Sequence, residues 1–376
     1  MLNRRMLRIK VMQSLFAYEQ CKEANYLLAD AHIEETFQPD LNSMEVQDKK
    51  LLASNRKIAR QLFETKFKKS DTPDDDDPVI NKTVKEALDF YLKSTKKDFT
   101  FLSKNMVIEV EKLTGYYYAV LGLMVALAEQ AASDKKINHS HFFSSPWIKA
   151  LESNNELKKE LAKGQWGWAN KQDKVRPWFR DVIKTDDTYN EYISKKKPDL
   201  EEQKAFIKHL YRKLILTGLI NDYFEEEDIR WAEDRDIIKG LVDKTIKSLD
   251  DKALTIDIQK VSLDWEDDSA FLSNLFAESA NLGKEHRKLI AKNTRNWEVD
   301  RLALTDRVIL EMAIAEMIHF PNIPVKVTIN EYIELTKEYS TPKSRQFING
   351  ILDVISKELQ TAGEIKKSGR GLIDNK

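Results

Sequence analysis

The sequence predicts an all-α fold because of its composition, its periodicity and its shortage of helix-breaking residues. Of 376 residues only 11 are Gly and 9 are Pro, well below the usual shares of about 7% and 5%. Apolar residues recur every three or four positions along most of the chain, which is the spacing of one face of a helix. A chain of this length forms roughly two to three domains.

The overall charge and the single cysteine narrow the classes of function. The 61 basic and 62 acidic side chains leave a net charge of −1, so any site for nucleic acid must be a local basic patch. Cys21 cannot form an internal disulfide, and the first residues lack the apolar region of a secretory signal, so we expect a cytoplasmic protein. The most apolar stretch, residues 116–128, is shorter than the ~20 residues that span a bilayer, and we expect a buried helix there.

Residues 1–24 are predicted to form the first helix, with a strongly basic beginning. An apolar stripe at helical spacing includes Leu7, Val11, Leu15 and Tyr18. Against the single acid Glu19, the first twenty residues carry four bases, which are Arg4, Arg5, Arg8 and Lys10.

Residues 25–262 are predicted to be a helical insertion or an enlarged N-terminal bundle. The clearest break is the run of four aspartates within residues 70–80, where like charges repel one another and a solvated loop is expected. A second irregular stretch, residues 163–179, contains Gly, Pro and three tryptophans. Helices are predicted at 45–69, 79–96, 101–132, 146–162, 199–220 and 226–249.

Residues 263–360 are predicted to form a C-terminal helical bundle, followed by a disordered tail at 361–376. Gly350 lies inside the last predicted helix, where glycine costs about 1 kcal/mol relative to alanine. We therefore expect another helix to pass close to its backbone. The helices predicted here are 267–293, 304–320, 327–339 and 342–360.

The last of these helices begins with an unusual charge pattern, "STPKSRQFING". Ser340 or Thr341 can cap the helix, and Pro342 suits its first position. A helix N-terminus carries about half a positive charge and favours acids, yet this one carries Lys343 and Arg345 and no acid. The pattern predicts that an anion from elsewhere binds at this end.

Catalytic and metal-binding motifs find little support in the sequence. It contains no phosphate-binding Gly-rich loop, no G-x-S-x-G and no H-E-x-x-H motif, and no cofactor or metal is expected. His139 and His141 can begin a metal site, but two surface histidines in a loop are the favoured interpretation. The tryptophans at 166, 168 and 178 can stack on bases, although packing of the irregular segment onto helices is favoured.

The two basic helix starts suggest a single-stranded nucleic-acid site. If the first and last helices pack so that these ends adjoin, their bases form a groove beside the aromatic ring of Phe347. Backbone N–H groups at the start of the last helix would add affinity for phosphate. Each basic patch alone is more often a solubilising surface.

The chain contains four ordered blocks of sequence, "RRMLRIKVMQSLFAYEQ", "NWEVDRLALTDRVILEMAIAEM", "IPVKVTINEYIELTKEYS" and "KSRQFINGILD". Together these blocks resemble the family of the bacterial transcription antitermination factor NusB. The resemblance implies NusB-like packed helical bundles with an enlarged N-terminal helical region, and a non-catalytic RNA-binding protein. It also implies binding of the boxA element of ribosomal RNA leader transcripts together with NusE, the small-subunit ribosomal protein of the S-ten family, within the RNA polymerase antitermination complex.

The resemblance also implies site residues, by position in these blocks. The partner-protein surface falls on Tyr18 and Asp306, although Asp306 can equally serve the N-terminus of its own helix. Four further matching residues, Trp297, Asn330, Asn349 and Gly350, are interpreted as packing and capping residues. The RNA-binding candidates are Arg4, Arg5, Arg8, Gln13, Lys343, Arg345 and Phe347.

Two departures from the family leave alternatives open. Glu311 stands where the family commonly has arginine, which places any ion pair of that arginine in doubt, and the insertion 25–262 has no counterpart in the compact members. One alternative is a helical interaction scaffold in which the insertion carries the main function. Another, a ribosomal RNA methyltransferase with a NusB-like domain, needs a methyl-donor domain that the sixteen residues after Gln360 do not supply, so we do not expect it. The sequence does not distinguish a free monomer from a homodimer.

Overall fold

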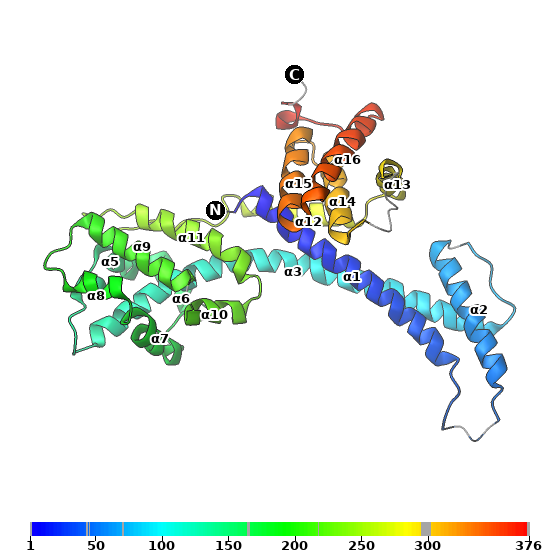
Figure 1. Cartoon of the computed structure of the whole chain (residues 1–376), viewed down its shortest axis with the longest axis horizontal. Coiled ribbons are helices and arrows are strands. Elements are labelled where there is room, and N and C mark those ends of the chain that lie inside the picture. The colour runs from blue at the N-terminus through cyan, green and yellow to red at the C-terminus, as the bar shows by residue number, and fades with distance from the viewer. Residues whose placement is uncertain are drawn as a thin grey trace. The chain divides into compact units, whose positions relative to one another are not determined.

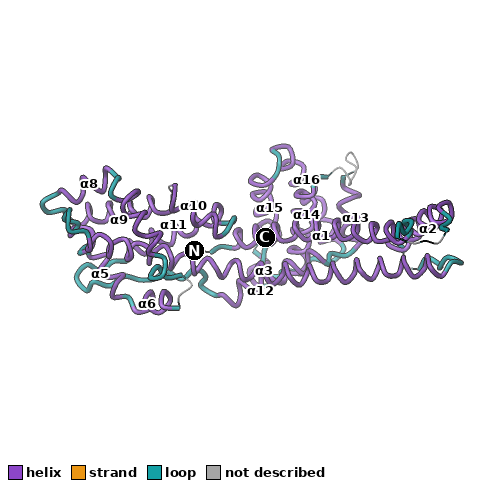
Figure 2. Tube along the Cα trace, turned by 90° about the horizontal axis from the view of Figure 1, so that it is seen from below, coloured by secondary structure: helices purple, strands orange, loops and turns teal. Residues whose placement is uncertain are grey.

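The computed structural model describes residues 2–42, 44, 46–69, 71–163, 166–216, 218–294 and 302–373, with backbone alone at 215 and 216. These residues form helices joined by loops, and no β-strand occurs among them (Figure 2). The all-α class predicted from the sequence is confirmed. The chain divides into two compact units, unit 1 with residues 1–3 and 108–266, and unit 2 with residues 4–107 and 267–376.

Unit 2 contains the first helix and the whole C-terminal bundle. In Figure 1, α14, α15 and α16 group beside the first part of α1, whose later part continues to α2. The helices of this unit are α1 (Arg4–Thr36), α2 (Lys49–Lys68), the first part of α3 (Pro78–Ser133), α12 (Trp265–Ala280), α13 (Lys284–Asn293), α14 (Leu304–His319), α15 (Val325–Tyr339), α16 (Pro342–Thr361) and a 3-10 helix, Gly369–Leu372.

The α14 helix forms the centre of the C-terminal bundle. Apolar residues cover almost its whole circumference, and every residue from Val308 to Met317 is buried. A helix that is hydrophobic all round must be enclosed by others. It packs against α1, α13, α15 and α16.

A separate core lies where α1, α2 and α3 meet. Asp77 caps α3, since its carboxylate accepts a hydrogen bond from the Val79 amide at 2.7 Å. The aspartate run before it is a loop, as predicted. The core residues are Ala29 and Ile33 from α1, Phe37 directly after it, Ala59 and Phe63 from α2, and Ile80, Val84 and Ala87 from α3.

Unit 1 surrounds the second half of α3. The apolar stretch Tyr116 to Ala128 is buried there almost throughout, as predicted. No helix in the described part of the chain has the length and apolarity needed to cross a membrane. The other helices of unit 1 are α4 (Ser140–Phe143), α5 (Pro146–Ser153), α6 (Asn155–Ala162), α7 (Gln172–Trp178), a π-helix (Phe179–Ile183), α8 (Asp187–Ser194), α9 (Leu200–Leu216), α10 (Gly218–Glu227) and α11 (Trp231–Lys247).

Two predicted helix ends were placed too early. The first helix continues to Thr36, and the helices predicted at 79–96 and 101–132 form one helix of 56 residues, α3. Neither Gly nor Pro stands at these positions to end a helix. The compact units group residues 4–107 with residues 267–376. The predicted bounds of the insertion, 25–262, and of the C-terminal bundle, 263–360, stay a prediction.

Three predicted helices are divided in the structure. Between α5 and α6 the Asn154 side chain accepts a hydrogen bond from the Leu157 amide at 2.9 Å and so starts a new helix. Gly218 begins α10 with a φ of +38°, in the left-handed region that favours glycine. The helix predicted at 267–293 ends at Ala280, and α13 starts after Gly283.

The tail differs from the predicted disorder up to the last described residue, 373. The Lys367 ammonium group donates a hydrogen bond to the Phe320 carbonyl oxygen at 2.9 Å, and the Ser368 amide donates to the Pro321 carbonyl oxygen at 3.0 Å. A Cβ at Gly371 would lie 2.0 Å from the same Pro321 oxygen, so only glycine fits this approach. The tail thus lies against the end of α14.

Candidate nucleic-acid interface

The start of α16 is capped as the sequence predicted. Thr341 has extended backbone angles, and its hydroxyl accepts a hydrogen bond from the Ser344 amide at 3.2 Å. Pro342 occupies the first helical position, and the first turn contains no acid. The predicted basic helix start is therefore present in the structure.

An internal carboxylate faces this end of α16. The Ser340 and Ser344 hydroxyls donate hydrogen bonds to the two carboxylate oxygens of Asp306, at 2.5 and 2.7 Å. Asp306 is only 5% exposed. Part of the negative charge that the helix start favours thus comes from the chain itself, and Asp306 links α14 to α16.

The bases at the start of α16 point outward. Lys343 and Arg345 are exposed, and within the described part of the chain neither forms an ion pair shorter than 4.0 Å. Phe347 is half-buried and lies one turn after Lys343, on the same side of the helix. The start of α16 thus offers two exposed cations, Lys343 on the side of the Phe347 ring and Arg345 on the side of the helix that faces α15.

Arg4 at the start of α1 is paired with acids. Its guanidinium donates a hydrogen bond to the Asp267 carboxylate and lies 3.9 Å from an oxygen of Asp268. It also stacks over the Phe271 ring, with 4.3 Å between the guanidinium carbon and the ring centroid. All three partners belong to α12, so Arg4 joins α1 to that helix.

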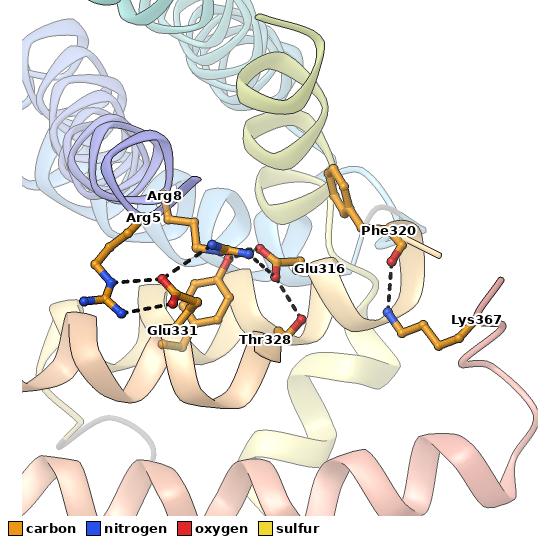
Figure 3. A network of polar contacts seen from close by, with 8 residues as sticks. Arg5, Arg8, Glu316, Phe320, Thr328, Glu331 and Lys367 are labelled. Atoms are coloured by element: carbon orange, nitrogen blue, oxygen red, sulfur yellow. Dashed lines mark hydrogen bonds and ion pairs between the residues drawn. The ribbon is translucent and has the colours of Figure 1, made fainter. Parts of the chain in front are cut away.

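Arg5 forms a two-pronged pair with Glu331 on α15 (Figure 3). Its Nε and Nη2 groups donate to the two carboxylate oxygens at 2.9 and 3.0 Å, while 42% of its side chain remains exposed. These hydrogen bonds raise the pKa of Arg5 and lower the pKa of Glu331. Arg5 is paired but accessible from solvent.

Arg8 lies in the interior and holds Glu316 of α14 (Figure 3). Its Nε and Nη2 groups donate to the Glu316 carboxylate at 2.7 and 2.8 Å, and its side chain is only 2% exposed. The Thr328 and Tyr332 hydroxyls of α15 donate to the same carboxylate at 2.8 and 3.1 Å. Burial lowers the pKa of Arg8, but the hydrogen bonds and charge of Glu316 outweigh it and leave the pKa above its ordinary value.

The remaining candidates on α1 are also largely enclosed. Lys10 is buried and Gln13 half-buried. Tyr18 is buried as well, where its ring meets Phe99 edge-on at 5.7 Å and Phe276 at 6.1 Å between centroids. Of the bases on this helix that were proposed to bind RNA, Arg4 and Arg5 reach the surface.

The two basic helix starts converge on one stretch of α15. Glu334 lies one turn after Glu331, the partner of Arg5. A hydrogen bond from Lys337 is the main cause that lowers the pKa of Glu334, and the charges of Arg5 and Arg345 lower it further. The two ends of the sequence therefore place positive charge around the same carboxylate.

A groove of about 510 Å³ lies between α15 and α16 at this place, and we refer to it as the α15/α16 groove. Its lining is mostly polar and includes three carboxamides. The lining residues are Asn330, Ile333, Glu334, Pro342, Arg345, Gln346 and Asn349.

Several residues of this region were interpreted wrongly or missed. Asn330 and Asn349 are exposed and line the groove instead of packing, while Trp297 lies outside the described residues. The close helix expected at Gly350 is absent from the described chain, because a Cβ there would meet nothing within 4 Å. The acids Asp267 and Glu331 were missed, since no local pattern marks a partner more than 260 residues away.

Glu311, at the position where arginine is common in the family, has an ion pair of its own. Arg287 of α13 brings its Nε within 3.2 Å of the Glu311 carboxylate. Burial raises the pKa of Glu311, and the Arg287 charge opposes this shift. The substitution thus attaches α13 to the central helix α14.

The other chemical candidates have structural roles. The His139 ring is buried and not at the surface as expected, with Nδ1 2.8 Å from the Tyr189 hydroxyl oxygen, and His141 Nε2 lies 2.8 Å from the Lys195 carbonyl oxygen. Within the described residues no group of His, Cys, Asp and Glu is arranged to hold a metal ion. Trp168 is buried and donates to the Ala119 carbonyl oxygen at 2.7 Å, which confirms the packing interpretation for that ring. Burial raises the pKa of Cys21, which disfavours a reactive thiolate.

Comparison with known proteins matches the NusB family model to residues 236–357. The chain is 43% identical to a transcription antitermination protein NusB of Salinibacter ruber over 116 residues, which are 30% of this chain and 72% of that protein. It is 51% identical to the NusB protein of Chloroherpeton thalassium over 85 residues, 23% of this chain and 40% of that protein. For the NusB protein of Koribacter versatilis the identity is 42% over 103 residues, 27% of this chain and 70% of that protein. No solved structure matches the chain significantly.

Proposed function

Because the chain belongs to the NusB family of non-catalytic transcription antitermination factors, we propose that it binds the boxA element of ribosomal RNA leader transcripts together with NusE. In this proposal it acts in the cytoplasm as part of the RNA polymerase antitermination complex. The observation that supports it best is that Arg345 lines the α15/α16 groove together with Glu334, one turn of α15 after the Glu331 that holds Arg5.

The proposed RNA path begins at α16. Lys343 and Arg345 are exposed cations that can meet phosphates, and the Phe347 ring, one turn after Lys343, offers a stacking surface for a nucleobase. Stacking on such a ring contributes about 1–3 kcal/mol per base. Unpaired bases and a flexible backbone are what single-stranded RNA presents to such a surface.

The path continues to α1 by exchange of ion-pair partners. Arg4 and Arg5 can turn from Asp267 and Glu331 toward RNA phosphates, because both guanidinium groups are partly exposed. Arg8 acts in this proposal by holding α1 on α14 and α15 through Glu316. Lys10 adds its charge from a buried position, and Gln13 contributes from a half-buried one.

The proposed NusE surface lies on α1 and α14 around Tyr18 and Asp306. Phe16 is an exposed aromatic on α1 close to Tyr18 in the sequence, and Arg307 beside Asp306 is ion-paired with Glu19 of α1 at 3.2 Å. Tyr18 and Asp306 support this surface from beneath, since both are buried.

A titration of labelled boxA RNA with and without NusE tests the proposal. If about four basic side chains neutralise phosphates, the logarithm of the RNA affinity should fall with the logarithm of the salt concentration with a slope near −3, from about −0.7 per contact. Replacing Lys343 and Arg345 by Gln should weaken binding and flatten this slope. Lys357→Gln, an exposed charge change near the other end of α16, is the matched control. A salt-independent affinity, or equal affinity in all three proteins, contradicts the assigned surface.

A further inference from the structure

The α15/α16 groove offers more than positive charge. Its volume of about 510 Å³ falls within the range of roughly 300–1,000 Å³ that is typical of small-ligand pockets. Asn330, Gln346 and Asn349 each bring a carboxamide, which carries both donors and an acceptor. Ile333 and Pro342 add apolar surface at the same place. Polar edges beside a small apolar face match the two aspects of a nucleobase.

The position of the groove relates it to the RNA path. Arg345 lines the groove and belongs to the same turn of α16 as Lys343, so a phosphate held there would place the attached nucleotide at the groove. Carboxamides pair with nucleobase edges through paired donor and acceptor groups, and such pairs discriminate between bases. Arginine and lysine contacts to phosphate do not discriminate between bases, because every nucleotide carries the same phosphate.

Gly350 provides a second, independent observation. It lies inside α16, one turn after Gln346 and directly after Asn349, so it continues the stripe of residues that line the groove. A glycine within a helix destabilises it relative to alanine. No described residue uses the space, because a Cβ there meets nothing within 4 Å. A ligand that approaches the backbone closely at this position would explain why a glycine stands here inside a helix.

We propose that the α15/α16 groove binds one unpaired base of single-stranded RNA, with Asn330, Gln346 and Asn349 at its edge and the RNA chain passing close to the backbone of Gly350. This inference rests on the proposed RNA-binding function and adds to it a site that discriminates between bases. The exposed basic side chains of α16 then supply affinity for RNA, and the groove supplies a preference for the RNA sequence.

The first test is Gly350→Gln, with a boxA RNA oligonucleotide as the probe. Glutamine favours the helix and projects into open space, so the variant should be at least as stable as the wild type in thermal unfolding. Its RNA affinity should fall tenfold or more, because the new side chain occupies the space beside the groove. Val354→Gln, an exposed change one turn further along α16, should leave the affinity unchanged. Unchanged affinity in a stable Gly350→Gln protein overturns the inference.

The second test identifies the base. Oligonucleotides in which each base in turn is removed are titrated against the wild type and against Gln346→Ala/Asn349→Ala. One abasic position should weaken binding to the wild type about tenfold or more and have little effect on the variant. Removing the base and removing the two carboxamides abolish the same contact, so the second change adds little to the first. Equal losses in both proteins at every position overturn the groove site.

The two proposals fail in different ways. If the wild type shows no salt-dependent binding of RNA, the proposed function fails and the groove site fails with it. If the wild type binds RNA and the Lys343/Arg345 variant binds it weakly, while Gly350→Gln binds normally, only the groove site is overturned.

Discussion

The basic side chains at the start of α1 lie among carboxylates, whereas those at the start of α16 lie open to solvent. Arg4, Arg5 and Arg8 each have an acidic partner on another helix. Lys343 and Arg345 have none within 4.0 Å in the described part of the chain. Both regions are basic in the sequence, but the first uses its charge to hold the bundle together. The second keeps its charge available for a ligand.

This difference assigns separate tasks to the three arginines of α1. Burial of a charged pair is costly unless its geometry and further hydrogen bonds compensate for lost hydration. Arg8 and Glu316 meet this condition through the hydroxyls of Thr328 and Tyr332. Arg5 and Glu331 remain partly hydrated, so their pair costs less to open. We therefore expect changes at these positions to differ strongly in size and kind.

The largest effect is expected for Arg8→Met. Removing one partner of a buried pair costs about 3–5 kcal/mol, because Glu316 is left as an uncompensated buried charge. The free energy of unfolding is followed by urea denaturation together with hydrogen exchange of the α14 and α15 amides. Arg5→Met is the control and should cost only about 0–1 kcal/mol, the range of an exposed pair. A loss of similar size in both variants would remove the distinction between the buried and the accessible arginine.

The next effect is on the salt dependence of RNA binding, to which the basic side chains of α1 and those of α16 should contribute differently. Replacing Lys343 and Arg345 by Gln should flatten the salt slope by about 1.4, which corresponds to two lost phosphate contacts. Replacing Arg4 and Arg5 by Gln should flatten it less, since their charge is already partly neutralised by acids of the chain. The slopes are measured by fluorescence titration at several salt concentrations. A greater change in the Arg4/Arg5 variant would reverse the comparison.

The prediction of the fold from sequence succeeded where the signal is local. Apolar spacing located α14, α15 and α16 to within two residues at each end, and Thr341 and Pro342 marked the start of α16. Divisions such as that at Asn154 were missed, because a single capping side chain determines them. The tail was missed for a different reason, since its order depends on the distant carbonyl groups of Phe320 and Pro321.

For the candidate site, the sequence identified basic residues but not their partners. Arg5 and Arg8 look alike on the first helix, and only the positions of Glu331 and Glu316 make one accessible and the other buried. Such partners lie more than 300 residues away in the chain. Asp306 was assigned to a protein partner, while its hydrogen bonds to Ser340 and Ser344 depend on how α14 meets α16. Tertiary packing, not local pattern, decides these roles.

A smaller effect is expected for Glu331→Gln, which weakens the hold of the chain on Arg5. Without the carboxylate, Arg5 should turn more readily to an RNA phosphate, and RNA affinity should rise about two- to fivefold, or about 0.4–1 kcal/mol. Glu338→Gln, a charge change of the same size on the same helix, serves as the control for net charge. An equal gain in both variants would mean that the gain reflects net charge alone.

The last effect is on docking of the tail, not on RNA binding, and concerns Lys367, which lies at the edge of the same network (Figure 3). Burial lowers its pKa to about 8, and the charge of Glu316 partly opposes this shift. Between about pH 8 and the ordinary lysine value of about 10.4, the detached tail binds more protons than the docked one. Docking of the tail should therefore strengthen as the pH rises through this window and weaken as it falls to 8. The ¹³Cε signal of Lys367 in an NMR titration should move near pH 8, while that of the exposed neighbour Lys366 moves with the other lysines. If both titrate together, the Lys367 ammonium group is hydrated and the tail is not held against α14 in solution.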